Sequence, residues 1–209
     1  MKRIAILGLC TLSVSIAAWA NTIDLTNEFG SVTVTNAGIG TMHSELTGFA
    51  KNWRKAPPGH DLGSVSFSTG ALLSGTLFGG GTFSSNDSSF VATGLGKYGV
   101  PKGTIFSGRF GGPITWTLES HTGNNYVFDL AGLIAGTLYN GRQVSGTTEQ
   151  TVYVNQNLWD YNQRGTLHGG STRFSIPLRA GPEPDTWILS ATGVAIVIAA
   201  TRRRRRLRA

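Results

Sequence analysis

Cysteine is almost absent from this sequence, which has one, Cys10, among 209 residues. Charged residues are also scarce at 14%, well below the roughly 25% of typical soluble domains. One cysteine leaves no pair for an intrachain disulfide and no cluster of thiolate metal ligands. Hydrophobic residues nevertheless make up 40% of the chain and aromatic residues 10%. This content excludes a disordered protein, because disordered chains bury too little apolar surface to offset the entropy of folding.

The net charge of +7 arises at the two ends of the chain. Two basic residues open the sequence and six arginines close it, which leaves ten basic residues against nine acidic ones between Asn21 and Gly181. Nucleic-acid binding usually requires a basic surface on the folded domain. We therefore expect no nucleic-acid partner, and we interpret the terminal basic clusters as signals of membrane topology.

The first 20 residues have the three parts of a secretory signal peptide. Two basic residues precede an apolar run over 4–17, and Ala18 and Ala20 provide the small-x-small pattern of a cleavage site. We predict export through the secretion machinery and cleavage by signal peptidase after Ala20. Cleavage there removes Cys10, so the mature chain would contain no thiol.

The last 29 residues combine helix breakers, an apolar run and arginines. A helix over the apolar residues 187–201 would span roughly 22 Å, which is shorter than the ~30 Å hydrocarbon core of a bilayer. We expect a short transmembrane helix with Trp187 at one interface. The cytoplasmic end would carry Arg202, Arg203, Arg204, Arg205 and Arg206. An ordinary single-span anchor with a stop-transfer tail is the alternative.

This layout resembles the PEP-CTERM sorting signal of exported bacterial proteins. The resemblance rests on Pro182-Glu183-Pro184, Trp187, the apolar span and the arginine cluster, and covers residues 181–209. It implies that an exosortase, a membrane-embedded enzyme resembling cysteine transpeptidases, recognises the tail and removes it. The folded body would first be held outside the cytoplasm at the inner membrane, and would then reach the cell surface or the medium. Asp185 departs from the pattern, since a small polar residue is commoner there.

The pattern of residues 21–180 predicts a single all-β domain. Alternating apolar residues mark strands, as Ile114 and Trp116 do on one face of a strand. Asn140-Gly141 favours a tight hairpin, so we predict that Leu133–Tyr139 pairs antiparallel with Arg142–Thr148. Roughly ten short strands joined by glycine-rich turns indicate an antiparallel sandwich or a barrel.

Two segments have less regular patterns. Met42, Leu46, Phe49 and Trp53 follow helical spacing, and either a short helix or an extended loop is consistent with them. Residues 94–99 match Gly-x-Gly-x-x-Gly, but that motif holds phosphate only where a helix begins. Pro and Gly follow directly, so we predict a turn at 94–99.

The sequence has no recognisable catalytic, cofactor or metal motif. Its four histidines, His43, His60, His121 and His168, are scattered without the spacing of metal ligands. No Gly-x-Ser-x-Gly motif is present, and the nine acids between Asn21 and Gly181 are spread singly, so they suggest no facing pair of carboxylates such as a glycosidase uses. We therefore predict no catalytic residue, no bound metal and no cofactor.

Aromatic residues among amides mark the one candidate binding segment. Tyr153, Trp159 and Tyr161 lie in a stretch rich in Asn and Gln, a combination that suits stacking on sugars and hydrogen bonding to hydroxyl groups. The alternative, that these rings are anchors of the core or of a loop, is the interpretation we favour.

Three functions are consistent with these features. The leading hypothesis is a non-catalytic exported protein of the cell surface or the extracellular matrix. The second is a carbohydrate-binding module for exopolysaccharide, which would use Tyr153, Trp159 and Tyr161. The third is an extracellular hydrolase whose site forms only in the fold.

Overall fold

The structure, a computed structural model, describes residues 21–51, 54–57 and 59–176, with the backbone alone at Asn21, Arg54, Lys55 and Tyr161. Its described part is almost entirely β-sheet, as predicted. The first seven strands are β1 (Asn21–Glu28), β2 (Ser31–Thr35), β3 (Gly38–Lys51), β4 (Arg54–Lys55), β5 (Gly63–Ser68), β6 (Leu72–Thr76) and β7 (Gly80–Phe83). The remaining elements are β8 (Ser89–Leu95), β9 (Lys102–Phe110), β10 (Ile114–Thr122), β11 (Asn125–Leu138), β12 (Gln143–Asn155), helix α1 (Gln156–Asn162) and β13 (Arg164–Ile176).

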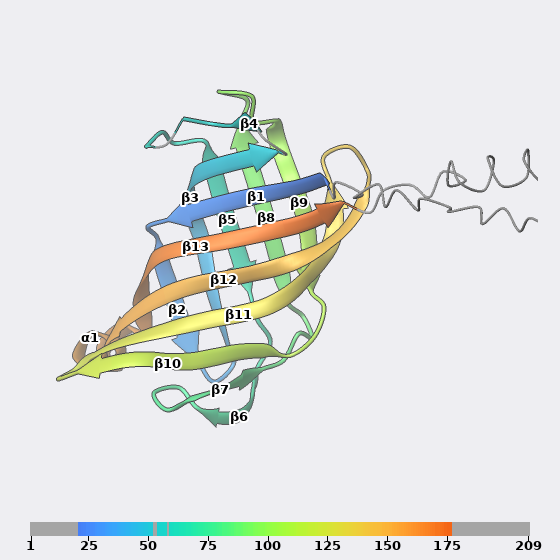
Figure 1. Ribbon diagram of the computed structural model, residues 1–209. Coiled ribbons are helices and arrows are strands. Elements are labelled where there is room, and N and C mark those ends of the chain that lie inside the picture. Colours follow the sequence, from blue (N-terminus) through green and yellow to red (C-terminus); the bar gives the residue numbers. More distant parts are fainter. Residues whose placement is uncertain (1–20, 52–53, 58, 177–209) are drawn as a thin grey trace, which may run out of the picture.

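Eight strands close into an antiparallel barrel, which decides between the two predicted architectures. The order around the barrel is β1-β3-β5-β8-β9-β11-β12-β13, and β13 pairs with β1 to complete the ring. In Figure 1, β10 to β13 and β1 cross the front of the barrel, while β5, β8 and β9 run behind them at a steep angle. Closure pairs the edges that an open sheet would expose.

Extra strands lie end to end with barrel strands and continue them in the same direction. β2 lies between β13 and β3 in the same register as β1, so the two form one interrupted strand. β10 likewise continues β9 alongside β11. Gly111-Gly112-Pro113, which lies between β9 and β10, is therefore a bend in a strand that keeps its direction. Because each barrel strand neighbours the next one in the chain, the topology is an up-and-down meander.

Inward-facing side chains fill the barrel. Its largest buried members are aromatic, and Trp116 stacks on Phe128 with ring centroids 4.3 Å apart. The Trp116 indole Nε1–H also donates to the Leu77 carbonyl oxygen at 2.7 Å, which fixes the β6–β7 hairpin against the core. The strand predicted from Ile114 and Trp116 is thus confirmed, with both side chains buried.

The helix or loop considered for residues 42–53 is wrong over residues 42–51, which form most of β3, while residues 52–53 lie outside the described part of the chain. β-bulges explain the misleading pattern. Thr47 is an extra residue relative to β1, so the inward side chains of Leu46 and Phe49 are three positions apart instead of two. That spacing imitates a helical repeat within a strand.

Two other local predictions are confirmed, one of them only in part. The predicted hairpin is present, but Leu133 pairs with Thr147 and Thr137 with Gln143, so the loop has three residues, 139–141, and the register is shifted by one residue from that of a two-residue Asn140-Gly141 turn. The chain turns after β8 at residues 96–101, and no helix begins there.

Helix α1 was not predicted. The Asn155 side chain accepts a hydrogen bond from the Leu158 amide at 3.3 Å and caps its N-terminus. Gln163 ends it in the left-handed conformation, and its amide donates to the Trp159 carbonyl at 2.7 Å. The candidate aromatic segment is therefore a capped turn of helix between β12 and β13.

Candidate functional site

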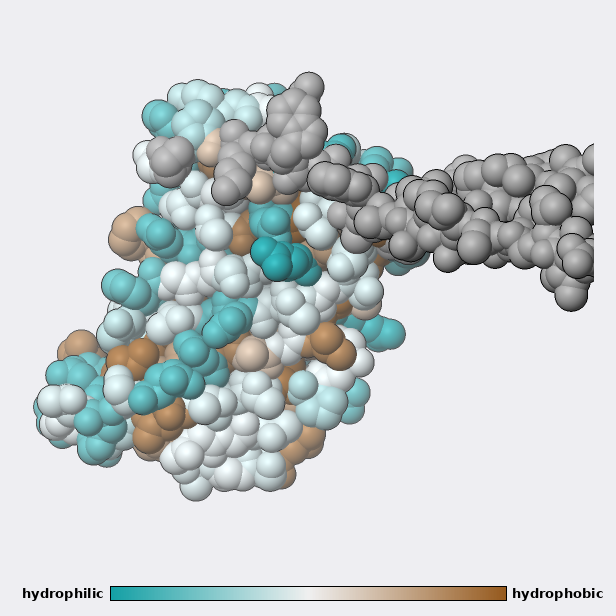
Figure 2. All heavy atoms as spheres, viewed as in Figure 1, coloured by the Kyte–Doolittle hydropathy of each residue, from teal (hydrophilic) through white to brown (hydrophobic). Residues whose placement is uncertain are grey.

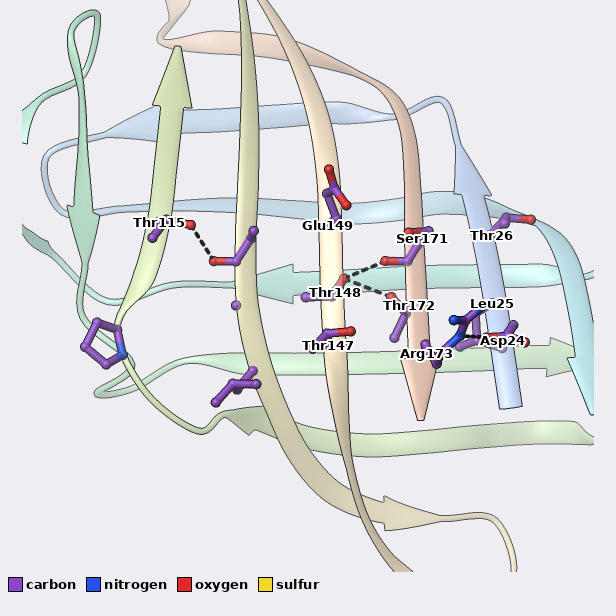
Figure 3. Close-up of a pocket in the computed structure, with 14 residues that line it drawn as sticks. Asp24, Leu25, Thr26, Thr115, Thr147, Thr148, Glu149, Ser171, Thr172 and Arg173 are labelled. Atoms are coloured by element: carbon purple, nitrogen blue, oxygen red, sulfur yellow. Dashed lines mark hydrogen bonds and ion pairs between the residues drawn. The ribbon is translucent and has the colours of Figure 1, made fainter. Parts of the chain in front are cut away.

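A groove crosses the outer face of the barrel over β10, β11, β12, β13 and β1 (Figure 3). Its volume is about 630 Å³. Neighbouring strands lie about 4.8 Å apart, so five strands give the groove a length of about 19 Å. An open groove of this length suits an extended chain molecule better than a compact one.

Most of the polar residues that line the groove carry a hydroxyl group, although the greater part of its exposed surface is apolar. Thr26, Thr115, Thr147 and Ser171 come from four different strands, and all four residues are exposed. Leu133, 59% exposed, adds an apolar surface. Figure 2 shows the same face as mostly pale residues of intermediate hydropathy, with scattered hydrophilic ones. Hydroxyl groups beside an apolar surface are what sugar hydroxyl groups and sugar ring faces can contact.

Charged groups lie in and beside these hydroxyls. The Nε atom of Arg173 donates to Oδ1 of Asp24 at 2.6 Å, with the arginine side chain 70% exposed. This hydrogen bond raises the pKa of Arg173 above its ordinary value, so the guanidinium stays charged. Glu149 is exposed between β11 and β13 and is the second acid of the groove.

The floor of the groove is held by hydrogen bonds between inward-facing residues. The hydroxyl groups of Thr148 and Thr172 are 2.8 Å apart, and Thr148 also donates to the Ser171 carbonyl at 3.3 Å. Gln150 Nε2 donates to the Thr148 hydroxyl at 2.9 Å from inside the barrel. These bonds tie β12 to β13 and fix the spacing of the outward side chains.

A polar cluster continues inside the barrel behind this floor. Asn27 Nδ2 donates to Gln150 Oε1 at 2.9 Å and to the Ser44 hydroxyl at 2.8 Å. Gln150 Nε2 approaches Asn27 Oδ1 at 3.3 Å. In the described part of the chain, every buried side-chain nitrogen and oxygen has a hydrogen-bond partner. The cluster is satisfied internally, so we assign it to the fold.

The predicted aromatic site is not assembled as expected. Trp159 is partly buried: its indole Nε1–H donates to the Val34 carbonyl at 2.7 Å, and its ring meets Phe78 edge-on at 5.0 Å. It anchors α1 to the end of the barrel, as the alternative reading of these rings required. The Tyr161 side chain lies outside the described part. Tyr153 is 41% exposed and packs edge-on against His168 at 4.8 Å.

The histidines lie apart from one another. His60 stacks on Tyr98 at 4.7 Å and His121 on Tyr126 at 4.1 Å. Among residues 21–51, 54–57 and 59–176, no three His, Cys, Asp or Glu side chains are grouped in a way that could hold a metal ion.

The predicted sorting residues lie outside the described part of the chain. They are Ala18, Ala20, Pro182, Glu183, Pro184, Trp187 and the arginines from 202 to 206, together with the helix expected over 187–201. No helix among the described residues is both long and apolar enough to cross a membrane. The described ends are close together, because Asn21 pairs with Ile176.

Comparisons with known protein families, with curated proteins and with solved structures found no match.

Sequence reasoning missed the groove altogether. Its residues come from positions as far apart as Asp24 and Arg173, and no local motif links them. The available signal was the outward threonines and serines of the predicted strands, but their grouping depends on the order and register of strands.

Proposed function

We propose that this chain is an exported, non-catalytic protein of the cell surface or extracellular matrix whose barrel binds exopolysaccharide along the outer groove. Delivery would use the secretion machinery, signal peptidase and an exosortase-like enzyme. The observation that carries the binding role is the groove itself, a hydroxyl-rich channel across five strands.

The ends of the barrel are compatible with processing on both sides. β1 begins at Asn21, which is the first residue that cleavage after Ala20 would leave. β13 ends at Ile176, five residues before Gly181 and the Pro-Glu-Pro segment. Cutting at both places would remove no residue of the described strands.

The charges of the groove favour binding over hydrolysis. Glycosidases generally use two carboxyl groups that flank the sugar linkage. Two acids line the groove, and one of them, Asp24, is paired with Arg173. Glu149 is the one groove carboxylate for which the described residues provide no ion pair. A single carboxylate among hydroxyls can accept hydrogen bonds from sugar hydroxyl groups.

The sorting part of the proposal is tested by the intact mass of the protein recovered from the surface or medium of its native host. We expect a mass that corresponds to a chain from Asn21 to the neighbourhood of Pro184. A mass that retains residues 187–209 would mean a permanent anchor, and release by an exosortase-like enzyme would be wrong.

The binding part is tested by titrating the full-length chain, in mild detergent, with the native exopolysaccharide and with cellohexaose, a neutral glucose chain. Thr147→Val removes a groove hydroxyl, and we expect it to weaken binding about fivefold, the value of one hydrogen bond. Thr104→Val makes the same change at an exposed position of β9 outside the groove and serves as the matched control. Absence of binding, or equal affinities for the two variants, would contradict the proposal that the groove binds polysaccharide.

A further inference from the structure

A stripe of exposed side chains crosses four neighbouring strand positions away from the groove. It consists of Tyr153 on β12, His168 on β13, Phe29 between β1 and β2, and Met42 on β3. Phe29 is 61% exposed, Met42 76% and Tyr153 41%. Figure 2 shows hydrophobic residues along the left margin of this face, where β1 ends in Figure 1. These four residues are called the aromatic stripe below.

The strand registers bring the stripe together from distant parts of the sequence. Gly30 accepts a hydrogen bond from the Leu167 amide at 2.9 Å, which places Phe29 opposite His168. His168 contacts Tyr153 on its other side, with ring centroids 4.8 Å apart. On the next strand, Val32 pairs with Thr41. Met42 is therefore opposite Ser31, two residues from Phe29. Four strand positions at about 4.8 Å spacing give the stripe a width of about 14 Å across the strands.

Phe29 holds its exposed position in an unfavourable backbone conformation. Its φ is +59°, in the left-handed region that residues other than glycine rarely adopt. Core burial does not compensate for this, because most of the ring faces solvent. A glycine would fit the same backbone better, so the phenyl ring contributes something other than stability.

Two carboxylates flank the stripe. Glu28 and Glu45 are directly opposite each other in the β1–β3 pair, and both point outward. Like charges at such a position repel, since directly opposite side chains have Cβ atoms about 5 Å apart. Among the described residues neither carboxylate forms an ion pair. Arg164 precedes His168 by four residues on β13. It lies at the end of that strand that is away from the groove.

We propose that the aromatic stripe, with Glu28 and Glu45, is a second binding site and takes amine-bearing sugar residues of a polysaccharide. Ring faces attract ammonium groups and contact the apolar faces of sugars. The two glutamates supply the negative charge that an ammonium group complements, and they disfavour polymers of acidic sugars. The inference shares with the proposed function only the chemical class of the ligand.

The two sites can be tested separately because they occupy different stretches of the same strands. Ser171 in the groove and His168 in the stripe are three residues apart on β13, which is about 10 Å. A polysaccharide chain lying along the groove would not need to touch the stripe.

The test titrates the full-length chain in mild detergent with three hexasaccharides. These are N-trimethylglucosamine hexamer, the neutral N-acetylglucosamine hexamer and the acidic galacturonate hexamer. Trimethylation keeps the charge at about pH 8, where ordinary histidines are neutral. We expect the trimethylated hexamer to bind about tenfold more tightly than the neutral one, and the galacturonate to bind most weakly.

Variants locate this binding at the stripe. Tyr153→Ala should weaken binding of the cationic hexamer about tenfold, whereas Tyr139→Ala, which removes a tyrosine of equal 41% exposure elsewhere, should not. Phe29→Gly should weaken it similarly while leaving the unfolding midpoint unchanged or higher. The double variant Glu28→Gln, Glu45→Gln should abolish the preference for the cationic hexamer over the neutral one.

The outcomes for the two proposals are distinguishable. If Phe29→Gly and Tyr153→Ala bind the cationic hexamer like the original chain, the stripe is not a binding site, whatever happens in the groove. Equal affinity for the cationic and neutral hexamers would also overturn the proposal. If the stripe variants lose binding while Thr147→Val has no effect on cellohexaose, the stripe stands and the groove proposal fails.

Discussion

Substitutions of the two buried amides, Asn27 and Gln150, should have strongly non-additive effects on the free energy of unfolding. Each is fully buried, and the Gln150 amide is linked to Asn27 in both directions, at 2.9 and 3.3 Å. We predict that Gln150→Ala lowers the free energy of unfolding by about 3 kcal/mol, because it leaves Asn27 Oδ1 without a partner and opens a small cavity. Asn27→Ala should cost about the same, since it leaves Gln150 Oε1 without a partner.

The double variant Asn27→Ala, Gln150→Ala should lose about 4 kcal/mol instead of 6, because neither buried amide remains to be orphaned. Neighbouring groups keep other partners: Thr148 still bonds to Thr172, and Ser44 still donates to the Glu28 carbonyl. The coupling free energy is then about 2 kcal/mol. Equilibrium urea unfolding followed by tryptophan fluorescence measures all four proteins. Additive losses, within about 0.5 kcal/mol, would refute the coupling read from the hydrogen bonds.

Three further substitutions test other parts of the fold. Trp116→Phe removes the hydrogen bond to the Leu77 carbonyl and should lower the free energy of unfolding by about 2–3 kcal/mol, measurable in urea. Gly170→Ala should cost about 2 kcal/mol, because its Cβ would lie 2.0 Å from Gln150 Oε1 and push that amide off its partners; an unchanged midpoint would contradict this. Arg173→Gln should leave the unfolding midpoint unchanged, because exposed ion pairs contribute little to stability; a clear drop in the midpoint would contradict this.

Local sequence pattern was enough to predict the strands and one hairpin. Alternation placed Ile114 and Trp116 on one face of β10, and both are buried. Asn140-Gly141 located the hairpin of β11 and β12, although its loop contains one residue more than the predicted two-residue turn. These predictions succeeded because each depends on neighbours within a few residues.

Predictions failed where a β-bulge interrupts the alternation of side chains, and where the tertiary fold sets the direction in which a side chain points. Alternation is lost at Thr47, where one extra residue shifts the inward face of β3. Trp159 was a candidate for sugar binding because amides surround it in sequence, but α1 turns its ring toward the barrel end. Composition describes the surroundings of a residue in sequence and carries no information about the direction in which a capped helical turn points it.

Neither the groove nor the aromatic stripe could be predicted from local pattern. Both consist of outward positions on strands separated by more than 100 residues, and they exist only once β13 pairs with β1 to close the ring. A shift of one residue in that pairing would turn the outward side chains of β1 and β13 inward. The decisive information is the long-range register, which a single sequence does not display.

In the closed barrel, the residues that stabilise the fold are different from the residues that we propose to bind ligands. The pairing of β13 with β1 satisfies the backbone, and the inward side chains form the core together with the polar cluster of Asn27 and Gln150. Outward residues such as Thr147, Tyr153 and Phe29 contribute little to either. Substitutions at the groove and at the stripe should therefore change affinity while the unfolding midpoint stays within the small range typical of surface positions. If such variants instead unfolded the protein, the outward face would belong to the fold, and both binding proposals would lose their physical basis.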